Sequence, residues 1–532
     1  MSISQTFDAR QTVCVNPATG EVTGHSPINT PEEAREALRR AQAAQLVWAA
    51  LPLAERMSYL LRLRDDLVDH ADAISAMISQ DVGKTRIEAL ATEVLPSALA
   101  TDYYAKNARR FLKPRKIRNG SLLFLNKRSR LYRVPFGVIG IIAPWNYPLG
   151  IPIHEIVPAL LAGNTVIFKT APETQRVGRV IEEMMQAARL PEGVFTHLNL
   201  PGAVAGEVLL EPGHHVDKLF FTGSVPVGKL LMARAAETLT PVSLELGGND
   251  AMLVCPDANL ERAVNGAIWA GLQNSGQSCG GVERIYVHQE VYGPFTQRLK
   301  ERVETLRQGP DVQHNVDIGA MCTERQIKTI QRQVDDAFTK GAAILAQVTI
   351  DPAHAHAQFY PATVLVNVDH RMELMRQETF GPVLGVMQVR DMEEALELAN
   401  DSSLGLTGSV WSNNTSAAVA LGRRIQAGVI TINDHLLTHS MAETPWGGFK
   451  ESGIGRSHGE PGFDEMTQPQ VVTTELLPFA RRNLFWHPYD ATLYAGLKGA
   501  LQLLYSHEFG ERWRGLLSFA KLIPRMFSHS SS

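Results

Sequence analysis

Residues 138–146 read VIGIIAPWN, an apolar run that ends in a polar turn. A run of this kind is typical of a strand buried on both faces of a sheet. From here on, apolar runs alternate with segments of helical length. We predict strands at residues 138–142, 165–168, 194–200, 219–221 and 242–246, with a helix between each pair. This alternation predicts a parallel sheet with helices on both of its faces.

Polar residues and glycines follow these strands, at the ends where parallel sheets bind ligands. Asn146 follows the first predicted strand and Lys169 the second. Gly223 and Ser224 follow the fourth, and Glu245 lies at the end of the fifth. Because the carboxyl ends of parallel strands share one edge of the sheet, we expect these residues to face a common cleft.

A second region of the same kind extends from residue 251 to residue 432. Strands are predicted at residues 252–254, 285–287, 383–389, 407–411 and 429–432, and a helix precedes Cys279. These patterns predict a second α/β lobe that carries this thiol. A cleft between two lobes, with phosphate-binding turns on one and a nucleophile on the other, is what a cofactor-dependent enzyme needs.

Cys279 is the candidate nucleophile, in the run GQSCGG at residues 276–281. Its small neighbours leave room for a carbonyl substrate, and nearby amides or a helix end would lower the pKa of the thiol. Taken alone, a buried structural cysteine explains the motif equally well. The run also spells the G-x-S-x-G of serine hydrolases. That motif requires a strand before the serine and a helix after it, whereas here a helix precedes Ser278 and a strand follows it.

The stretch FTGSVPVGK at residues 221–229 nearly spells the P-loop of nucleotide-hydrolysing proteins. Leu230 stands where that motif needs a Ser or Thr to bind magnesium, so nucleotide hydrolysis lacks a required residue. A turn of this kind between a strand and a helix can still hold a pyrophosphate on its backbone amides. The sequence contains no GxGxxG, which is the commonest dinucleotide fingerprint.

Three further side chains fit the chemistry of a thiol enzyme. The amide of Asn146 could donate to an oxygen that gains negative charge, although an Asn between prolines also suits a turn. Glu245 could act as a general base if apolar surroundings raise its pKa, and is otherwise a surface charge at a strand end. Glu378 could accept a hydrogen bond from a sugar hydroxyl, or it could cap a turn.

Composition argues against several other classes of protein. The 532 residues include 44% hydrophobic residues and carry a net charge of −4, without the dense Lys/Arg stripe of a nucleic-acid-binding protein. The four cysteines lie far apart with no CxxC, and the histidines lack metal-binding spacing, so we expect neither disulfides nor a metal site. The N-terminal residues show no export signal, and we expect a cytoplasmic protein.

Seven motifs, taken in their order along the chain, resemble the aldehyde dehydrogenase superfamily over about residues 15–475. They are PWNYP, GNTVIFK, FTGS, LELGG, GQSC, ETFGP and PWGGFKESGIGR. The resemblance implies an α/β fold of two doubly wound lobes, one for the cofactor and one catalytic, plus a small bridging or oligomerisation element. It implies a dinucleotide-binding domain of residues 1–121 and 138–244, a catalytic domain of residues 245–432, and a bridging arm of residues 122–137 and 433–479. Such proteins are usually homodimers or homotetramers.

The same resemblance implies the oxidation of an aldehyde to its carboxylic acid with NAD(P). Cys279 would attack the aldehyde, Asn146 and the Cys279 amide would steady the oxyanion, and Glu245 would activate the water that hydrolyses the thioester. The presence of Glu245 favours a free acid over transfer to coenzyme A. A scaffold protein that has lost catalysis is the non-enzymatic alternative, and the retention of all three residues argues against it.

The cofactor contacts also follow from the resemblance. They are Lys169 at the adenosine ribose, Gly223, Ser224 and Gly228 at the pyrophosphate, Trp145 at the cofactor wall, and Glu378 with Phe380 at the nicotinamide ribose. Many NAD-preferring relatives place Glu three residues after the lysine, whereas this chain has Pro172 there and the carboxylate one residue later, at Glu173. NAD is the predicted cofactor and NADP the alternative, since a missing carboxylate would remove repulsion of a 2′-phosphate.

Residues 480–532 lie beyond the resemblance and contain two amphipathic stretches. One places Leu493, Leu497, Leu501 and Leu504 on a face, and the other does so with Trp513, Leu516, Leu517 and Ala520. Two hypotheses follow. The first, which we favour, is a helical cap packed on the protein or on a neighbouring subunit. The second is an interfacial anchor with its Lys and Arg near lipid phosphates, where an enzyme at the inner membrane surface could take up an apolar, long-chain aldehyde.

Overall fold

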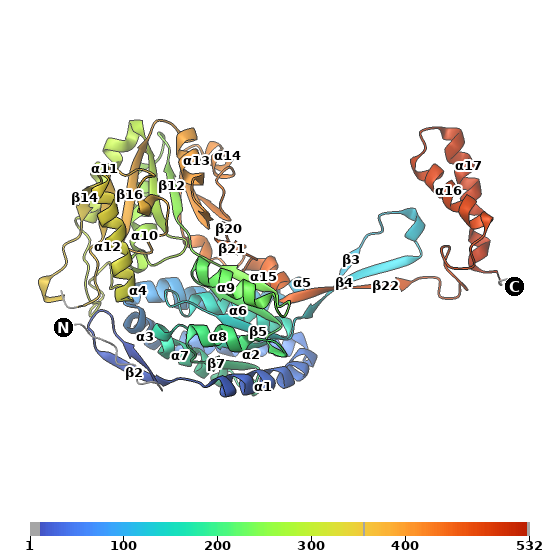
Figure 1. The fold of residues 1–532 in the computed structure, drawn as a ribbon, viewed down its shortest axis with the longest axis horizontal. Coiled ribbons are helices and arrows are strands. Elements are labelled where there is room, and N and C mark those ends of the chain that lie inside the picture. The colour runs from blue at the N-terminus through green and yellow to red at the C-terminus, as the bar shows by residue number, and fades with distance from the viewer. Residues whose placement is uncertain (1–10, 355–356, 529–532) are drawn as a thin grey trace. The chain divides into compact units, whose positions relative to one another are not determined.

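The computed structural model describes residues 11–354 and 357–528. The chain divides into two compact units, which are described separately here (Figure 1). Unit 1 comprises Met1–Lys113 and Arg133–Gln468, and unit 2 comprises Pro114–Tyr132 and Pro469–Ser532. Both predicted α/β lobes lie within unit 1.

The first lobe contains a six-stranded sheet in the order β21-β11-β10-β5-β6-β7. Its strands are β5 (Val138–Ile142), β6 (Thr165–Lys169), β7 (Phe195–Leu198), β10 (Lys218–Thr222), β11 (Val242–Glu245) and β21 (Gly453–Ile454). The first five run parallel, as predicted, and β21 is antiparallel. The sheet grows outward from β5 in both directions, so its winding reverses between β5 and β10.

Helices cover both faces of this sheet because its central strands are apolar on both sides. One face shares a core with α2 (Leu53–Asp69), α5 (Leu95–Leu112), α6 (Gly150–Ala162) and α7 (Gln175–Ala187). The other shares a core with α1 (Pro31–Ala50), α8 (Gly202–Leu209) and α9 (Val225–Ala235). Along β5, Ile139 and Ile141 belong to the first core, and Val138 and Ile142 belong to the second. This alternation is the period of two expected of a strand buried on both faces.

The second lobe contains a seven-stranded sheet in the order β14-β15-β16-β13-β12-β18-β19. Its strands are β12 (Asp250–Val254), β13 (Val282–His288), β14 (Ala343–Gln347), β15 (Thr363–Val366), β16 (Val383–Val389), β18 (Thr407–Trp411) and β19 (Val429–Ile432). The helices α10 (Leu260–Leu272) and α11 (Gln289–Val303) cover one face, and α12 (Glu324–Thr339), α13 (Met392–Asn400) and α14 (Thr415–Gly422) cover the other. Sequence patterns missed β14 and β15, since β14 is a mostly exposed antiparallel edge strand and β15 has only four residues.

Shorter elements complete unit 1. They are β1 (Gln11–Val15), β2 (Val22–Pro27), α3 (Ala71–Val82), α4 (Arg86–Ala89), a π-helical turn (Leu90–Val94), β8 (Leu210–Glu211), β9 (His214–His215), β17 (Leu404–Gly405), β20 (Phe449–Lys450) and α15 (Gly459–Glu465). Strand β21 pairs with β11, and β20 pairs with β17. Residues 433–468 therefore lie in unit 1, whereas the sequence analysis grouped residues 433–479 with the arm.

Unit 2 combines a small sheet with a helical hairpin. The sheet has the order β22-β4-β3, from β22 (Thr467–Glu475), β4 (Lys127–Pro135) and β3 (Arg115–Ile117). The first segment of the expected bridging arm, residues 122–137, contains β4, and its residues 122–124 form a 3-10 turn. Helices α16 (Ala491–Tyr505) and α17 (Phe509–Ala520) lie side by side (Figure 1). No helix in the described part of the chain is long and apolar enough to cross a bilayer.

Candidate active site

One cleft of unit 1 lies beyond the carboxyl ends of the parallel strands of the first lobe. Its volume of about 620 Å³ is in the range of small-molecule sites. The first lobe contributes Trp145, Asn146, Lys169, Gly223, Ser224 and Glu245 to its lining, and the second contributes Cys279, Glu378 and Phe380. The structure thus brings together every predicted site residue except Gly228. The cleft includes the edge between β5 and β10, where the winding of the sheet reverses.

A tight backbone turn presents Cys279 to this cleft. Asn274, Ser275 and Gly276 have φ angles of 54°, 56° and 69°, all in the left-handed region. A Cβ at Gly276 would lie 2.1 Å from the carbonyl oxygen of Gly381, so this position requires glycine. Backbone strain of this kind is typical of functional sites, where the surrounding structure has to hold it. Of the four free cysteines, Cys279 alone is partly exposed.

The Cys279 thiol is held in its protonated form. Burial raises its pKa well above the usual value, and the charges of Glu245, Glu378 and Asp250 raise it further. A hydrogen bond involving the Gly280 backbone lowers the pKa by less than these effects raise it. The prediction of a lowered thiol pKa was therefore wrong for the unliganded protein. The thiol has to lose its proton to a base before it attacks a carbonyl.

Glu245 has the properties of that base. Burial raises the pKa of its carboxyl to about 7, while hydrogen bonds from Trp446 and Thr222 oppose the rise. The Trp446 indole N–H donates to Glu245 Oε1. A small cavity of about 20 Å³, enough for one water molecule, is lined by Glu245 and by a second buried carboxyl, Glu155. Burial and the charge of Glu245 raise the pKa of Glu155 well above its usual range.

Two donors near the thiol suit a developing oxyanion. Asn146 Nδ2 donates one hydrogen bond to the Gln277 carbonyl over 3.1 Å, which orients the amide and leaves its second N–H. The backbone N–H of Cys279 donates to no group within the described residues. Amide donors fixed in advance in a buried cleft stabilise developing charge more strongly than water does. Both groups thus keep an N–H that could donate to an oxyanion, and the oxyanion role expected of Asn146 and of the Cys279 amide stays a prediction.

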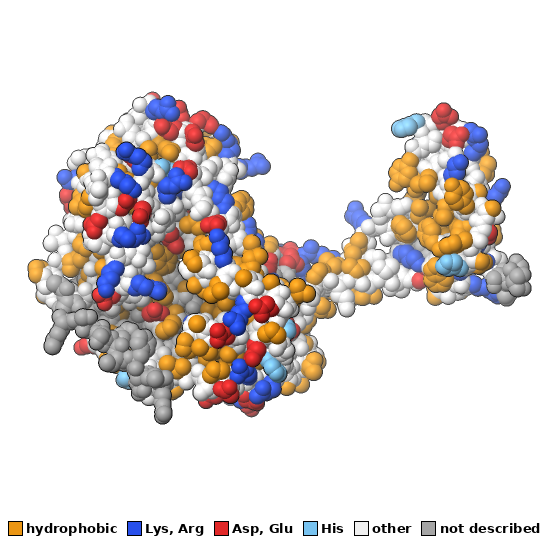
Figure 2. All heavy atoms as spheres, in the orientation of Figure 1, with side chains coloured by type: hydrophobic (Ala, Val, Ile, Leu, Met, Phe, Trp, Pro, Cys, Tyr) orange, Lys and Arg blue, Asp and Glu red, His pale blue; other side chains and the backbone are white. Residues whose placement is uncertain are grey.

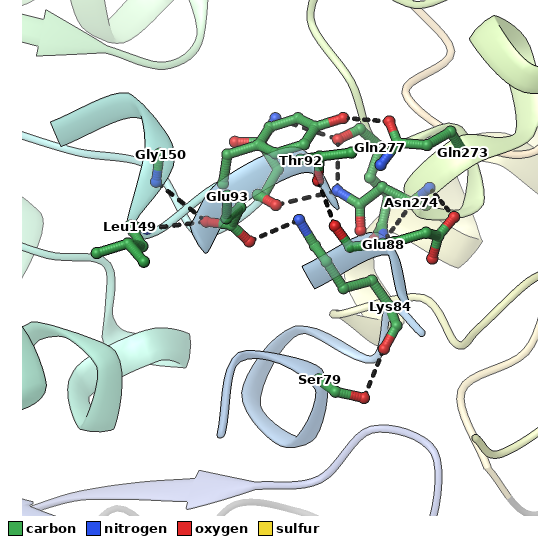
Figure 3. A network of polar contacts seen from close by, with 12 residues as sticks. Ser79, Lys84, Glu88, Thr92, Glu93, Leu149, Gly150, Gln273, Asn274 and Gln277 are labelled. Atoms are coloured by element: carbon green, nitrogen blue, oxygen red, sulfur yellow. Dashed lines mark hydrogen bonds and ion pairs between the residues drawn. The ribbon is translucent and has the colours of Figure 1, made fainter. Parts of the chain in front are cut away.

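A buried polar network contacts the turn at residues 274–276 that precedes Cys279 (Figure 3). Lys84 Nζ lies 2.8 Å from Glu93 Oε1, and neither side chain is exposed. Glu93 Oε2 accepts hydrogen bonds from the backbone N–H groups of Leu149 and Gly150, which begin α6. Glu88 Oε1 accepts from the backbone N–H of Asn274 over 2.8 Å. The network thus holds both the segment after Asn146 and the turn before Cys279.

The sequence analysis missed this network because Lys84, Glu88 and Glu93 precede the first recognised motif, PWNYP at residues 144–148. Asn274 Nδ2 completes the network by donating to the carbonyls of Asn146 and Gln277. A signal was present: Glu93 falls on the helical stripe that contains Ala89, Ala100 and Tyr104, which is otherwise apolar or small. A charge on a buried helical face indicates a specific partner. A π-helical turn at Leu90–Val94, a feature frequent at functional sites, positions Glu93.

The cleft also fits a dinucleotide. Ser224 precedes α9, and its side chain caps none of the amides at the start of that helix, which leaves them for an anion. Burial lowers the pKa of Lys169 to about 8, so its ammonium stays largely charged at neutral pH. The rings of Trp145 and Phe380, one from each lobe, pack edge to face at 5.5 Å. These groups would hold the phosphates, the ribose and the nicotinamide side of NAD(P).

Two predicted cofactor residues occupy informative positions. Glu378 accepts a hydrogen bond from the backbone N–H of Gly248 over 3.0 Å, so its carboxylate is fixed at the junction of the lobes. A Cβ at Gly228 would lie 2.7 Å from Leu246 Cδ2, so this glycine allows α9 to pack against a residue that lines the cleft. Its contact with pyrophosphate stays a prediction. Within the described residues, no cluster of His, Cys, Asp and Glu could hold a metal ion.

Comparison with known proteins identifies the family. The profile of the aldehyde dehydrogenase family matches residues 5–472. A Methylomonas protein named 4,4'-diapolycopene aldehyde oxidase is 36% identical over 496 residues, which cover 93% of this chain and 91% of that protein. A putative succinate-semialdehyde dehydrogenase [NADP(+)] of Mycolicibacterium smegmatis is 36% identical over 88% of this chain and 90% of its own length.

A solved structure agrees with the sequence comparisons. The NADP-dependent enzyme of E. coli superposes with a TM-score of 0.84 at 29% identity, over 88% of this chain and 96% of its own. The fold class and the superfamily expected from the motifs are both confirmed. The chain therefore belongs to the aldehyde dehydrogenase family and is an NAD(P)-dependent oxidoreductase that converts aldehydes to acids.

Proposed function

We propose that this enzyme oxidises an apolar aldehyde to the free acid, with Cys279 as the nucleophile and Glu245 as the base. The observation that carries the proposal is the convergence of three groups on one cleft: a protonated thiol, a carboxyl with a pKa of about 7, and the Asn146 amide. A base is most effective when its pKa lies near the working pH. Glu245 therefore suits both proton transfers that the reaction needs.

In the first half of the reaction, Glu245 accepts the proton of the Cys279 thiol and the sulfur attacks the carbonyl carbon. As the carbon–sulfur bond forms, the carbonyl π electrons move to oxygen, which accepts hydrogen bonds from Asn146 Nδ2 and the Cys279 N–H. The oxygen then re-forms its double bond, and the hydrogen on carbon leaves with its electron pair. Bound NAD(P) supplies the nicotinamide ring that accepts this hydride. Cys279 is left as a thioester.

In the second half, Glu245 has returned its first proton to solvent and removes a proton from water. The resulting hydroxide attacks the thioester carbon, the carbon–sulfur bond breaks, and the acid leaves. The thiolate of Cys279 is reprotonated. Because the same carboxyl serves both halves, its loss would affect hydrolysis even where the first half still proceeds.

We propose that the enzyme accepts NADP as well as NAD. Pro172 stands where many NAD-preferring relatives have Glu, and the carboxylate is displaced by one residue to Glu173, whose charge acts on Lys169. The mycobacterial relative and the E. coli structure both carry NADP in their names, which supports this choice. The preference for NAD over NADP expected from the sequence stays a prediction, which the ratio of the two kcat/KM values tests.

Electrostatics at the thiol supports an uncharged substrate. Burial is the largest cause of the raised pKa of Cys279, and it also raises the pKa values of the neighbouring carboxyls of Glu245, Glu378 and Asp250. The surroundings of the thiol therefore disfavour negative charge, and an aldehyde with its own carboxylate, such as succinate semialdehyde, would meet the same desolvation cost. The Methylomonas relative is named for an apolar, long-chain aldehyde. We therefore favour apolar, long-chain aldehydes over the short acidic aldehyde for which the mycobacterial relative is named.

The test is the production of reduced cofactor from purified protein with NAD or NADP. Acetaldehyde, hexanal, decanal and succinate semialdehyde serve as substrates, and Cys279→Ala is the control for the thiol. We expect Cys279-dependent reduction with kcat/KM rising from acetaldehyde to decanal. A higher kcat/KM for succinate semialdehyde than for decanal would refute the apolar substrate. Reduction that survives Cys279→Ala would refute the mechanism.

A further inference from the structure

Unit 2 is strongly basic in an otherwise acidic protein. Its two segments, residues 114–132 and 469–532, contain 13 Lys and Arg but only 4 Asp and Glu, a formal charge of +9. The whole chain carries −4, so the remaining residues carry −13. Charge separated to this degree gives unit 2 its own attraction for anionic surfaces.

Helix α17 turns its large apolar side chains outward. One face of this helix carries four large apolar side chains. They are Phe509 (82% exposed), Trp513 (55%), Leu516 (37%) and Leu517 (51%). Figure 2 shows hydrophobic side chains gathered over the α16–α17 hairpin, with basic side chains beside them. A helix that merely caps a protein buries this face. Here no other described part of unit 2 covers the face.

The opposite side of α17 makes the contact with α16. A Cβ at Gly515 would lie 2.4 Å from the Gly499 carbonyl oxygen, and one at Gly499 would lie 2.7 Å from that of Gly515. The two helices therefore approach through glycines, backbone against backbone. Glycines at a helix crossing let two backbones approach closely, so the large apolar side chains of α17 lie on its other faces. The small core of unit 2, with Leu484, Leu493, Leu522 and Met526, lies apart from this outward face.

Basic side chains flank the outward face of α17. Arg512 lies on one side of the apolar stripe, and Arg514 and Lys521 lie on the other, all exposed. Arg514 is paired with Glu511, whereas Arg512 and Lys521 have no ion-pair partner within the described residues. An apolar face with Trp and Phe, bordered by Lys and Arg, is the composition of helices that lie in a membrane interface.

We propose that unit 2 docks the enzyme on an anionic lipid bilayer, with the Phe509–Trp513–Leu516–Leu517 face of α17 inserted among the headgroups. The flanking cations pair with lipid phosphates, and the remaining basic residues of unit 2 add long-range attraction. A second copy of unit 2 fits this face less well, since two bodies of charge +9 repel each other, whereas the acidic unit 1 of a second copy is the competing occupant that the sedimentation below distinguishes. The match with the Methylomonas relative spans 496 residues, so it extends past residue 480 into this C-terminal segment.

The experiment uses the full chain and needs no catalysis, so its failure is separate from failure of the proposed reaction. Purified protein is floated with vesicles of phosphatidylcholine alone or with 30% phosphatidylglycerol. We expect binding to the anionic vesicles, weakened by 1 M salt because screening shortens the range of the charges. The double variant Trp513→Glu/Leu517→Glu should bind at least about tenfold more weakly, from the lost apolar burial.

A matched control places the same two charges on another exposed apolar helix surface. Leu46 and Val47 of α1 are 74% and 67% exposed and lie in unit 1, so Leu46→Glu/Val47→Glu should leave binding unchanged. Arg512→Gln should weaken binding about fivefold, the usual effect of one cation at a membrane surface. Sedimentation of each protein reports its assembly state. Absence of flotation, equal flotation of both double variants, or a change in assembly without a change in flotation would each overturn the proposal.

Discussion

Lys84→Met tests whether the buried network beneath the active-site turn stabilises the enzyme. Lys84 Nζ lies 2.8 Å from Glu93 Oε1, and both side chains are completely buried. Lys84 Nζ also lies 4.0 Å from the centre of the Tyr147 ring, next to Asn146. The substitution keeps an apolar stem of similar length but leaves the Glu93 carboxylate without its cation.

The expected cost follows from what remains around Glu93. Breaking a buried pair by removing one partner destabilises a protein by about 3–5 kcal/mol, since an uncompensated charge stays buried. Glu93 keeps the backbone donors of Leu149 and Gly150, so we expect the lower end, about 3 kcal/mol. Arg64→Met is the control. Arg64 pairs with Asp102 at 2.7 Å with both side chains more than a quarter exposed, a pair worth about 1 kcal/mol or less.

Urea unfolding followed by tryptophan fluorescence gives both free energies, and steady-state kinetics on the same samples gives the effect on the site. Because the network orients the segment of Asn146, we expect kcat to fall in Lys84→Met with little change in KM for NAD(P). A stability loss no greater than that of Arg64→Met would refute the assignment of a structural charge pair.

Three further outcomes are expected. Since the pKa of Glu245 is raised to about 7, the rate of thioester hydrolysis should rise about tenfold per pH unit below 7 and level off above it. Glu245→Gln should slow the first burst of reduced cofactor, stop turnover after that burst and lose this pH profile, and an unchanged profile would contradict the role. Pro172→Glu should lower kcat/KM with NADP relative to NAD about tenfold by repulsion of the 2′-phosphate, and an unaltered ratio would argue against that contact. Burial lowers the pKa of His439 from 6.5 to about 4. As the pH falls, His439 is therefore protonated in the unfolded chain before it is protonated in the folded protein, and the free energy of unfolding declines between pH 6.5 and 4 by up to about 1.4 kcal/mol per pH unit. His439→Phe should reduce this slope in urea titrations, whereas an equal slope would contradict the assignment.

Much of the site could be predicted because its residues follow recognisable strands. Asn146, Lys169, Ser224 and Glu245 stand at strand ends, and a parallel sheet brings such ends to one edge whatever the details of packing. The buried network could not be placed in this way. Lys84 lies in the loop between α3 and α4, and Glu93 lies in the π-helical turn. Their contact with the segments around Asn146 and Cys279 depends on how these elements pack, and neither residue lies in one of the quoted motifs.

The pKa values of the site also required the three-dimensional arrangement. The amides near Cys279 were expected to lower its pKa, yet burial and three carboxylates from distant segments raise it. Glu245 was expected to become a base only if its surroundings were apolar, and burial does raise its pKa to about 7. Desolvation and charge act through space, so sequence spacing does not report their balance.

The amphipathic tail separates the two kinds of information most clearly. Apolar periodicity alone predicted amphipathic stretches at Leu493–Leu504 and Trp513–Ile523, where the structure has α16 (Ala491–Tyr505) and α17 (Phe509–Ala520). Strand-end residues predicted which groups would share a cleft. The tertiary structure alone decided that α17 packs on α16 through Gly515 and leaves Trp513 exposed. The reason is that periodicity defines the faces of a helix, whereas the close approach of two backbones selects which face is buried.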